Sequence, residues 1–575
     1  MSRRRHSSNV FNRVGRIRPR RNKFDLSYRN NFTCKMGQLI PVMCDEAVPG
    51  DFFKIGNELT IRFQPMSAPI MHEITATVHY FFVPYRILWS QWEDFIVQGD
   101  TPPLPITPPI LSVVPSNNLR KTIWDYIGLP FFNREVSGSN YFAMPLMFPF
   151  LAYNMIWNEY YRDENLQAEL PDYYDSASPP VINDNLIRIR YRNWKKDYFT
   201  AALPFRQKGQ APALPVNTSL TWNNYSLNNL KYANTTLYNP TTSVNVLHGD
   251  IRNSPLASGS QPFSANMSVN PAEAGNIGVL GTNVNNIGPI LVGSVPGGTP
   301  GVTGLGLTTT TFNVSDLRLS FQIQKWLERN ARAGTRYTSF LQAHFGVSPT
   351  DARLDRPEYI GGTKQPVIIS EVLQTSQTTT DPQSGSPLAQ MAGHGLGADA
   401  QYAGNYNVQE YGVIIGLLSV MPKPSYQQGM NRQWLRRVPS DFYFPEFSHL
   451  SEQGIYNCEL FTNWVGSDSA IFGYTGQYDE MRVKHDIVAG EMRIRRDGYA
   501  EPWPENMQLS YWNLSRWFRT RPLLNDAFIT TQNNIPESRV FAVDGVDTLI
   551  VNCVNRIHAV RPLPLIAEPG LVDHF

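Results

Sequence analysis

The stretch Ile70–Trp89, IMHEITATVHYFFVPYRILW, contains the longest uninterrupted period-two pattern in the chain. Within Ile74–Phe82, apolar side chains alternate with Thr and His, and Pro69 and Pro84 bracket the run. Successive side chains of a β-strand point to opposite faces, so this pattern predicts a half-buried strand. Its β-branched and aromatic residues favour the same conformation. A strand of this length is typical of a large β-sandwich or barrel.

Further strands are predicted on both sides of this one. Cys34–Cys44 and Glu58–Gln64 precede it, and Pro366–Thr375 and Thr548–Val560 follow it. Tyr411–Met421 is continuously apolar, which is typical of a strand buried on both faces. Early strands, late strands and large insertions between them favour a mainly β Greek-key sandwich in which the last strand pairs near the first.

Two helices are predicted outside these strands. Residues 147–170 space their apolar side chains for one helical face, and Pro171 ends the pattern. The second helix runs from Ser315, the expected N-cap, to Gly334 at the C-terminal end. We expect it to flank the core through one apolar stripe, which consists of Leu319, Ile323, Trp326, Leu327 and Ala331.

Two segments have low complexity. Residues 211–312 contain four charged residues, and Asn, Thr, Ser and Gly dominate the rest. This segment could be a linker between two domains, but its Trp, Tyr and Phe residues favour an ordered insertion displayed at the surface. Residues 378–405 are rich in Gly, Ser and Gln and are predicted to be a second loop. The absence of an obvious linker elsewhere favours one elaborated domain over residues 31–575.

The charge of the chain is concentrated at its N-terminus. The net charge of the 575 residues is +2, from 50 Lys and Arg residues and 48 Asp and Glu residues. Nine of these cations lie within residues 1–23, which contain no acid, so the remaining 41 basic residues face 48 acidic ones. Residues 1–30 have few apolar side chains to offset the entropy of ordering, and we expect a flexible basic arm there.

This arm is the candidate DNA-binding site. Its cations can neutralise phosphates and release counterions without reading sequence. The alternative is a solubilising or targeting tail. The candidate residues are Arg3, Arg4, Arg5, Arg13, Arg16, Arg18, Arg20, Arg21 and Lys23.

A second basic segment, Leu186–Phe205, interleaves Arg and Lys with Tyr, Trp and Phe. Such a pattern could provide a stacking platform for single-stranded nucleic acid. The alternative is a strand whose aromatic side chains face the core while its cations face solvent or the acids of a neighbour, and we prefer this structural interpretation. The same alternatives apply to two smaller groups, Arg493, Arg495 and Arg496, and Arg516, Arg519 and Arg521.

Catalytic and metal-binding motifs are absent from the sequence. It contains no Gly-x-Ser-x-Gly, Gly-Lys-Ser/Thr or His-Glu-x-x-His pattern, and His394, in a Gly-rich stretch expected to be a flexible turn, has no second ligand at metal spacing. We therefore expect no enzyme and no cofactor. The four cysteines have no disulfide or zinc spacing, which favours buried thiols in a reducing compartment. No apolar run is long enough to span a bilayer, and we expect no membrane insertion.

Several long blocks resemble one known family, the major capsid proteins of the small icosahedral single-stranded DNA bacteriophages, the Microviridae, in particular the gokushovirus branch. The resemblance runs from about residue 20 to the end and skips the two low-complexity segments. The blocks are RRNKFDLSYRNNFTCKMGQLIPVMCDEAVPGDFF (Arg20–Phe53), FPFLAYNMIWNEYYRDENLQ (Phe148–Gln167), RNWKKDYFTAALPFRQKG (Arg192–Gly209), HFGVSPTDARLDRPEYIGG (His344–Gly362) and RIHAVRPLP (Arg556–Pro564).

The resemblance implies an eight-stranded antiparallel jelly-roll sandwich or barrel that assembles into a T=1-like, sixty-subunit icosahedral shell around circular single-stranded DNA. It implies location in the virion capsid, and in the host bacterial cytoplasm during assembly. The implied partners are further copies, the DNA genome, a small basic DNA-binding protein, an internal scaffolding protein, a DNA pilot protein and a bacterial surface receptor met by the insertion. The alternative is a phage-encoded jelly roll that binds or hydrolyses carbohydrate, because two catalytic carboxylates would leave no sequence motif.

Overall fold

The structure is a computed structural model that describes residues 20–66, 70–97, 106–111, 119–130, 145–175, 184–212, 218–221, 306–309, 314–373, 391–448, 450, 452–463, 466–494, 514–543 and 545–566. The chain divides into two compact units, residues 1–210 with 326–575, and residues 211–325. The first unit is mainly β, with antiparallel sheets and few helices, as predicted.

The largest sheet of the described residues has the strand order β1-β15-β4-β9-β8-β5-β10-β3, and β2 also pairs with β15. All of its pairings are antiparallel. The last strand therefore lies between the first strands and β4, which confirms the predicted meeting of the chain's two ends. The strands are β1 (Asn22–Asp25), β2 (Tyr28–Cys34), β3 (Ile40–Ala47), β4 (Phe52–Phe63), β5 (Ile74–Pro84), β8 (Glu358–Leu373), β9 (Met391–Asn407), β10 (Gly412–Pro422) and β15 (Leu549–Arg561).

The long strand β8 connects two layers of this sheet. Its first part pairs with β5, whereas residues 368–373 pair with β9. One layer thus contains β3, β10, β5 and the first part of β8, and the other contains β1, β2, β15, β4, β9 and the end of β8. We call these the helix-side layer and the arm-side layer.

The two layers pack face to face. From the helix-side strand β5, Phe82 places its ring 4.9 Å from that of Tyr406 in β9. Asn57 of β4 donates a hydrogen bond of 3.0 Å to Thr363 of β8. Asn555 of β15 donates one of 2.7 Å to the carbonyl of Val42 in β3. The alternation predicted for β5 is confirmed, because one face is fully buried between the layers: Ile74, Ala76, Val78, Tyr80 and Phe82.

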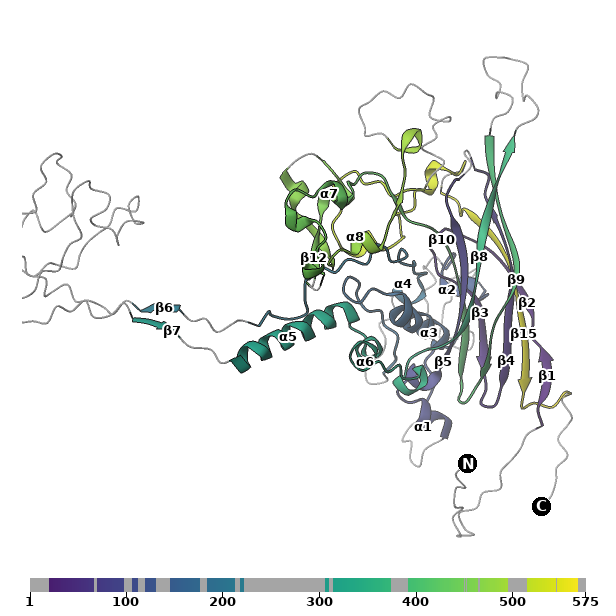
Figure 1. Ribbon diagram of the computed structural model, residues 1–575. Coiled ribbons are helices and arrows are strands. Elements are labelled where there is room, and N and C mark those ends of the chain that lie inside the picture. Colours follow the sequence, from purple (N-terminus) through teal and green to yellow (C-terminus); the bar gives the residue numbers. More distant parts are fainter. Residues whose placement is uncertain are drawn as a thin grey trace, which may run out of the picture. The chain divides into compact units, whose positions relative to one another are not determined.

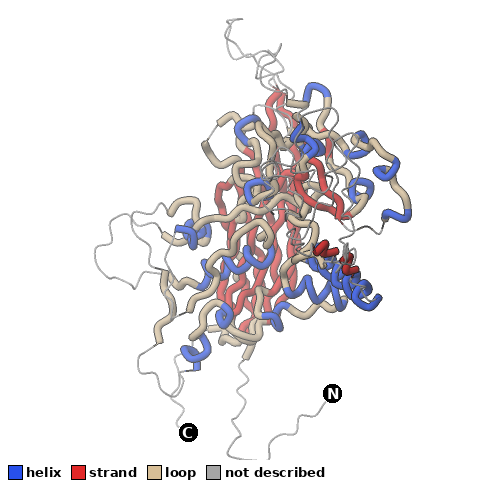
Figure 2. The backbone as a smooth tube through the Cα atoms, turned by 90° about the vertical axis from the view of Figure 1, so that its left-hand side faces the viewer, coloured by secondary structure: helices blue, strands red, loops and turns tan. Residues whose placement is uncertain are grey.

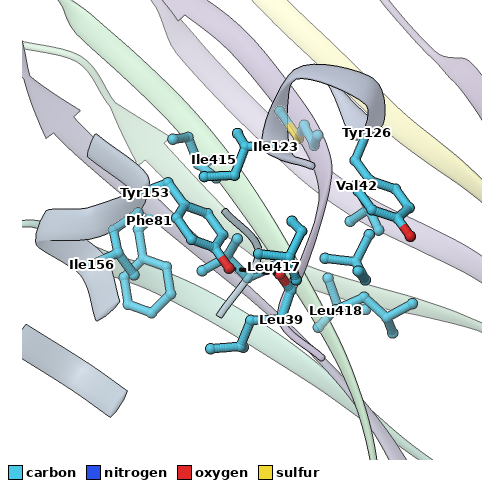
Figure 3. Packing of buried hydrophobic residues seen from close by; sticks show 14 of the residues in the cluster. Leu39, Val42, Phe81, Ile123, Tyr126, Tyr153, Ile156, Ile415, Leu417 and Leu418 are labelled. Atoms are coloured by element: carbon cyan, nitrogen blue, oxygen red, sulfur yellow. Dashed lines mark hydrogen bonds between the residues drawn. The ribbon is translucent and has the colours of Figure 1, made fainter. Parts of the chain in front are cut away.

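The other face of the helix-side layer is covered by helices (Figures 1 and 2). Helix α3 (Phe148–Ile156) and the π-helical turn Trp157–Tyr161 bring aromatic rings onto it. Phe81 of β5 lies 4.7 Å from Tyr160. Tyr153 of α3 points toward β3 and donates to the carbonyl of Leu39 at 2.8 Å (Figure 3). Because both faces are covered, β10 is buried at nearly every position, as its apolar sequence predicts.

A smaller hydrophobic cluster holds the remaining loops and short elements together. It is centred on buried side chains such as Phe199, Tyr426 and Phe528. The remaining helices are α1 (Trp92–Val97), α2 (Ile123–Tyr126), α4 (Asp184–Ile187), α5 (Val314–Ala333), α6 (Tyr337–Phe345), α7 (Asn457–Leu460), α8 (Asp479–Arg482) and α9 (Asp526–Ile529). The remaining strands are β6 (Thr218–Thr221), β7 (Gly306–Thr309), β11 (Ser425–Tyr426), β12 (Glu452–Tyr456), β13 (Ile471–Gly476) and β14 (Asp486–Ile487). Short 3-10 turns lie at Tyr85–Ile87, Asp351–Leu354, Arg432–Trp434, Pro439–Asp441, Pro445–Phe447, Gly466–Ser469, Gly490–Met492 and Glu537–Arg539.

Three predictions are corrected by these elements. The arm boundary at residue 30 is wrong, because β1 and β2 pair with β15 from Asn22 onward. The loop 378–405 is wrong for residues 391–405, which belong to β9 and include His394; the preceding residues lie outside the described ones. The helix expected over 147–170 already ends at Tyr161. Glycine suits β9 for a reason of packing, since a Cβ on Gly404 would lie 2.8 Å from the carbonyl oxygen of Ile360 in β8.

In the second unit, the structure describes the two ends of the predicted insertion. Strands β6 and β7 pair antiparallel, with Thr218 opposite Thr309. The chain therefore leaves and returns at adjacent points. Most of residues 211–312 lies outside the described part of the chain.

Candidate nucleic-acid interface

The described part of the predicted arm ends at one edge of the arm-side layer. Asn22 begins β1 and donates a hydrogen bond of 2.6 Å to the carbonyl of Leu563. Lys23 lies opposite Val560 in the β1–β15 ladder. The Nη2 atom of Arg21 lies close to Gly50, because a Cβ atom added to this glycine would be 3.4 Å from it. The base of the arm is thus fixed to the sheet by backbone pairing.

The structure brings together three of the nine predicted DNA-binding residues. Arg20, Arg21 and Lys23 lie within four residues of one another, and all three are exposed. The other candidates, Arg3, Arg4, Arg5, Arg13, Arg16 and Arg18, lie outside the described residues. Arg20, Arg21 and Lys23 therefore offer cations at the sheet edge, where an extended polyanion could reach them.

The basic aromatic segment Leu186–Phe205 is not a stacking platform, because its rings are used in the fold. Trp194, Tyr198 and Phe199 are buried. Arg192 donates to the hydroxyls of Thr77 and Ser419 at 2.8 and 2.9 Å. These contacts confirm the structural interpretation, although the segment forms isolated bridges at Tyr191 and Asn193 rather than a continuous strand.

The C-terminal arginine group has the same structural character at its centre. Arg516 is buried among four aromatic rings, of which Phe528 is the nearest at 4.1 Å. Its Nη2 atom donates to the carbonyl of Phe528 at 2.5 Å. Arg519 and Arg521 are exposed, whereas Arg495 and Arg496 lie outside the described residues. Sequence spacing cannot separate buried from exposed arginines here, because no regular element spans them.

His72 and Glu537 form contacts within the fold. The Nε2 atom of His72 lies 2.8 Å from the carbonyl oxygen of Lys423. A cavity of about 200 Å³ is lined in part by Glu537, whose carboxylate accepts from the Met36 amide and the Thr548 hydroxyl. Burial raises the pKa of Glu537. Among the described residues, no cluster of His, Cys, Asp or Glu has the geometry of a metal site.

The four cysteines are free thiols, of which Cys34 and Cys553 are buried and Cys44 and Cys458 are partly buried. Burial raises the pKa of Cys553 to about 12 and that of Cys34 further, so both remain protonated near neutral pH. Within the part of the chain that the structure describes, no helix combines the length and apolar character needed to cross a bilayer.

These features define the class of the protein. It is a two-layered β protein in which Arg20, Arg21 and Lys23 lie exposed at one sheet edge.

Comparison with known proteins gives the particular family. Residues 13–571 match the family described as Capsid protein (F protein), and the chain belongs to this family. It is 33% identical over 605 residues to Capsid protein VP1 of Chlamydia phage 1, with 98% of each chain covered. It is 29% identical to Capsid protein VP1 of Bdellovibrio phage phiMH2K over 99% of both chains. The corresponding protein of Spiroplasma virus 4 is 27% identical, over 96% of this chain and 95% of its own.

These relatives confirm the resemblance to the gokushovirus-like major capsid proteins of the Microviridae. They also confirm that the chain is a structural protein rather than an enzyme. Sequence reasoning reached the family through long blocks in the right order. It did not find the exposed face of the arm-side layer, because the cations on that face come from strands far apart in the sequence.

Proposed function

We propose that this chain is the major subunit of a virion shell, and that about sixty copies form a closed, T=1-like icosahedral capsid around circular single-stranded DNA. The observation that carries the proposal is the family match over residues 13–571. Assembly then takes place in the cytoplasm of the bacterial host, and the finished protein resides in the virion capsid.

The body of the subunit is an eight-stranded jelly roll in this proposal. The order of strands supports it: β2-β15-β4-β9 in the arm-side layer and β3-β10-β5-β8 in the helix-side layer. In each layer, neighbours come alternately from early and late parts of the chain, as two interlocked Greek keys require. Strand β1 then extends the edge formed by β2, so the one capsid domain with its insertion begins at residue 22 rather than at residue 31.

The N-terminal arm, now residues 1–21, points inward and binds the genome in this proposal. Its support is the charge pattern, together with an exposed base at Arg20 and Arg21. Flexible cations bind single strands through phosphate contacts and do not select a sequence. A small basic DNA-binding protein, an internal scaffolding protein and a DNA pilot protein would act beside the shell.

The insertion at 211–312 forms an outward protrusion that meets a receptor on the host surface. Its support is the β6–β7 ladder, which returns the chain to its starting point. A linker between two successive domains has no need of such a return. An insertion with paired ends can be lengthened or exchanged without disturbing the sheet that carries it.

Contacts between copies need apolar surface that the isolated subunit leaves exposed. Helix α5 offers such a surface, because its predicted apolar stripe is only partly covered. Of the five residues expected to flank the core, Leu327 and Ala331 are buried, whereas Leu319, Ile323 and Trp326 are exposed. We assign these three exposed side chains to an interface with a second copy.

Electron microscopy of the expressed full-length chain tests the function. Closed, uniform particles are expected, with or without the helper proteins. A population that contains only monomers or trimers under both conditions would favour the alternative of a carbohydrate-binding or hydrolysing jelly roll. The double variant Leu319→Asn and Ile323→Asn should fold but assemble poorly, whereas the control Arg318→Gln on the same helix should assemble normally.

A further inference from the structure

The outer face of the arm-side layer remains uncovered by the helices described in the first unit. Helices α2 and α3 pack on the helix-side layer instead (Figures 1 and 3). Strand register identifies the outward side chains, because they alternate with the buried ones in β4 and β15. We call this surface the outer face.

The cations of the outer face come from four strands. Lys23 of β1 lies opposite Val560, and Arg29 of β2 lies opposite Val554. On β4, Lys54 and Arg62 point outward beside His558 and Ile550 of β15. The last outward cation, Arg556, also lies on β15. All five are exposed: Lys23, Arg29, Lys54, Arg62 and Arg556.

Two acidic side chains balance part of this charge. Glu58 forms an ion pair with Arg556, and Asp25 lies 3.7 Å from the ring of His558. Asp399 of β9 is in register with the buried Leu59 and therefore belongs to the other side. The outer face is thus positive, although the chain beyond residue 23 has more acidic than basic residues.

Aromatic side chains lie among the cations. Tyr402 of β9 is 54% exposed, and the ammonium of Lys54 lies 5.5 Å from the centre of its ring. Phe52, two residues before Lys54 on β4, is also partly exposed. From Phe52 to Arg62 the face extends about 34 Å at 3.4 Å a residue, which is long enough to contact several nucleotides.

We propose that the outer face is a binding surface for single-stranded nucleic acid, continuous with the N-terminal arm that begins at its edge. Lys23, Arg29, Lys54 and Arg62 contact phosphates, and Tyr402 offers a face for a base. Such a surface reads no sequence, because phosphates and ring faces are common to all nucleotides. The proposal rests on the proposed function in that it orients this face toward the packaged genome.

Charge complementarity decides the occupant. A second copy of this chain would bring an excess of acids only if its acidic residues were gathered opposite this face, whereas a polyanion satisfies every exposed cation at once. The arm also concentrates nucleic acid here, since a strand bound by Arg20 and Arg21 is already adjacent to Lys23. The experiment below distinguishes nucleic acid from a second copy of the chain as the occupant of this face.

The test uses three triple variants of the full-length chain, compared at subunit concentrations below assembly. Binding of fluorescent oligothymidylate is measured by anisotropy over a range of salt concentrations. The neutral variant carries Arg29→Gln, Lys54→Gln and Arg62→Gln, and the charge-conserving variant carries Arg29→Lys, Lys54→Arg and Arg62→Lys. The remote control removes three exposed cations from loops outside this sheet, through Lys195→Gln, Arg353→Gln and Lys484→Gln.

The slope of log affinity against log salt should fall by about 2 in the neutral variant, since each lost contact on a single strand contributes roughly 0.7. The charge-conserving variant and the remote control should keep the wild-type slope. An unchanged slope in the neutral variant, or an equal fall in the remote control, overturns the proposal. If the neutral variant does not fold, the single change Arg62→Gln should still lower the slope by about 0.7.

Electron microscopy of the same proteins separates this inference from the proposed function. Absence of shells in the wild type would contradict the proposed function, while the slope comparison between free subunits would still decide the outer face. A neutral variant that loses shells but keeps its wild-type slope would identify the face as a contact between copies and overturn the inference.

Discussion

Replacement of Phe82 by alanine tests whether the two layers share a core. Phe82 is 1% exposed and packs against Tyr406 of the opposite layer. A buried aromatic side chain removes about 150–200 Å² from water, which at about 25 cal/mol per Å² corresponds to roughly 4–5 kcal/mol. Measured Phe→Ala changes in cores are about 3–5 kcal/mol. We therefore expect the free energy of unfolding to fall by about 4 kcal/mol.

The assay is urea unfolding of the unassembled chain, followed by tryptophan fluorescence. The matched control is Ile368→Thr on β8, which keeps a β-branched residue at a position that is 71% exposed. This control should change the free energy of unfolding by less than about 0.5 kcal/mol. A change of less than about 1 kcal/mol for Phe82→Ala would refute the reasoning, because Phe82 would then not be enclosed between two layers.

Three further predictions concern the arm, a buried histidine and the insertion. Deletion of residues 2–19 should leave the unfolding midpoint unchanged and reduce the DNA content of particles. Deletion of residues 2–25 should also lower the midpoint, because β1 is lost. An unaltered DNA content would show that the arm has no role in packaging. Burial, with a smaller contribution from Arg192, lowers the pKa of His79 to about 4. The Nδ1 atom of His79 lies 2.8 Å from the Tyr161 hydroxyl, and the ring of Tyr359 packs against the imidazole. The unfolded chain takes up this proton first as the pH falls from about 6.5 to about 4, so up to about 3 kcal/mol of stability is lost in that window. In urea titrations over the same pH range, the free energy of unfolding should fall less steeply for His79→Gln than for the wild type. Identical pH profiles of the two proteins would contradict the assignment of this loss to His79. Asp45, whose pKa burial raises to about 6, acts in the opposite direction in both proteins. Replacement of residues 225–300 by a short Gly-Ser linker should leave particle assembly intact and lower adsorption to host cells, and failure to assemble would instead identify the insertion as an interface.

Much of the fold is predictable because its strands carry local patterns. The alternation in Ile74–Phe82 predicts both the strand and its buried face, and the apolar run Tyr411–Met421 predicts a strand covered on both sides. Strand β9 carries no such pattern. Its Gly-rich sequence suits the close approach of β8, a tertiary contact that period-two reasoning does not detect.

The candidate site was predictable only where charge is contiguous in the sequence. Nine cations without an acid define the arm, but β1 could not be recognised within it because Asn22–Asp25 is too short to show alternation. The exposed cations Arg29, Arg62 and Arg556 are separated by hundreds of residues or by whole strands, and only strand register brings them to one face. Conversely, the sequence around Arg516 indicates a surface cation, but in the structure its side chain is buried among aromatic rings.

Cryo-electron microscopy of DNA-filled particles tests the central claim most directly. We expect a closed shell in which the outer face of the arm-side layer is turned toward the interior, with nucleic-acid density against Lys54 and Arg62 of β4. Particles that carry this face on their exterior would contradict the claim.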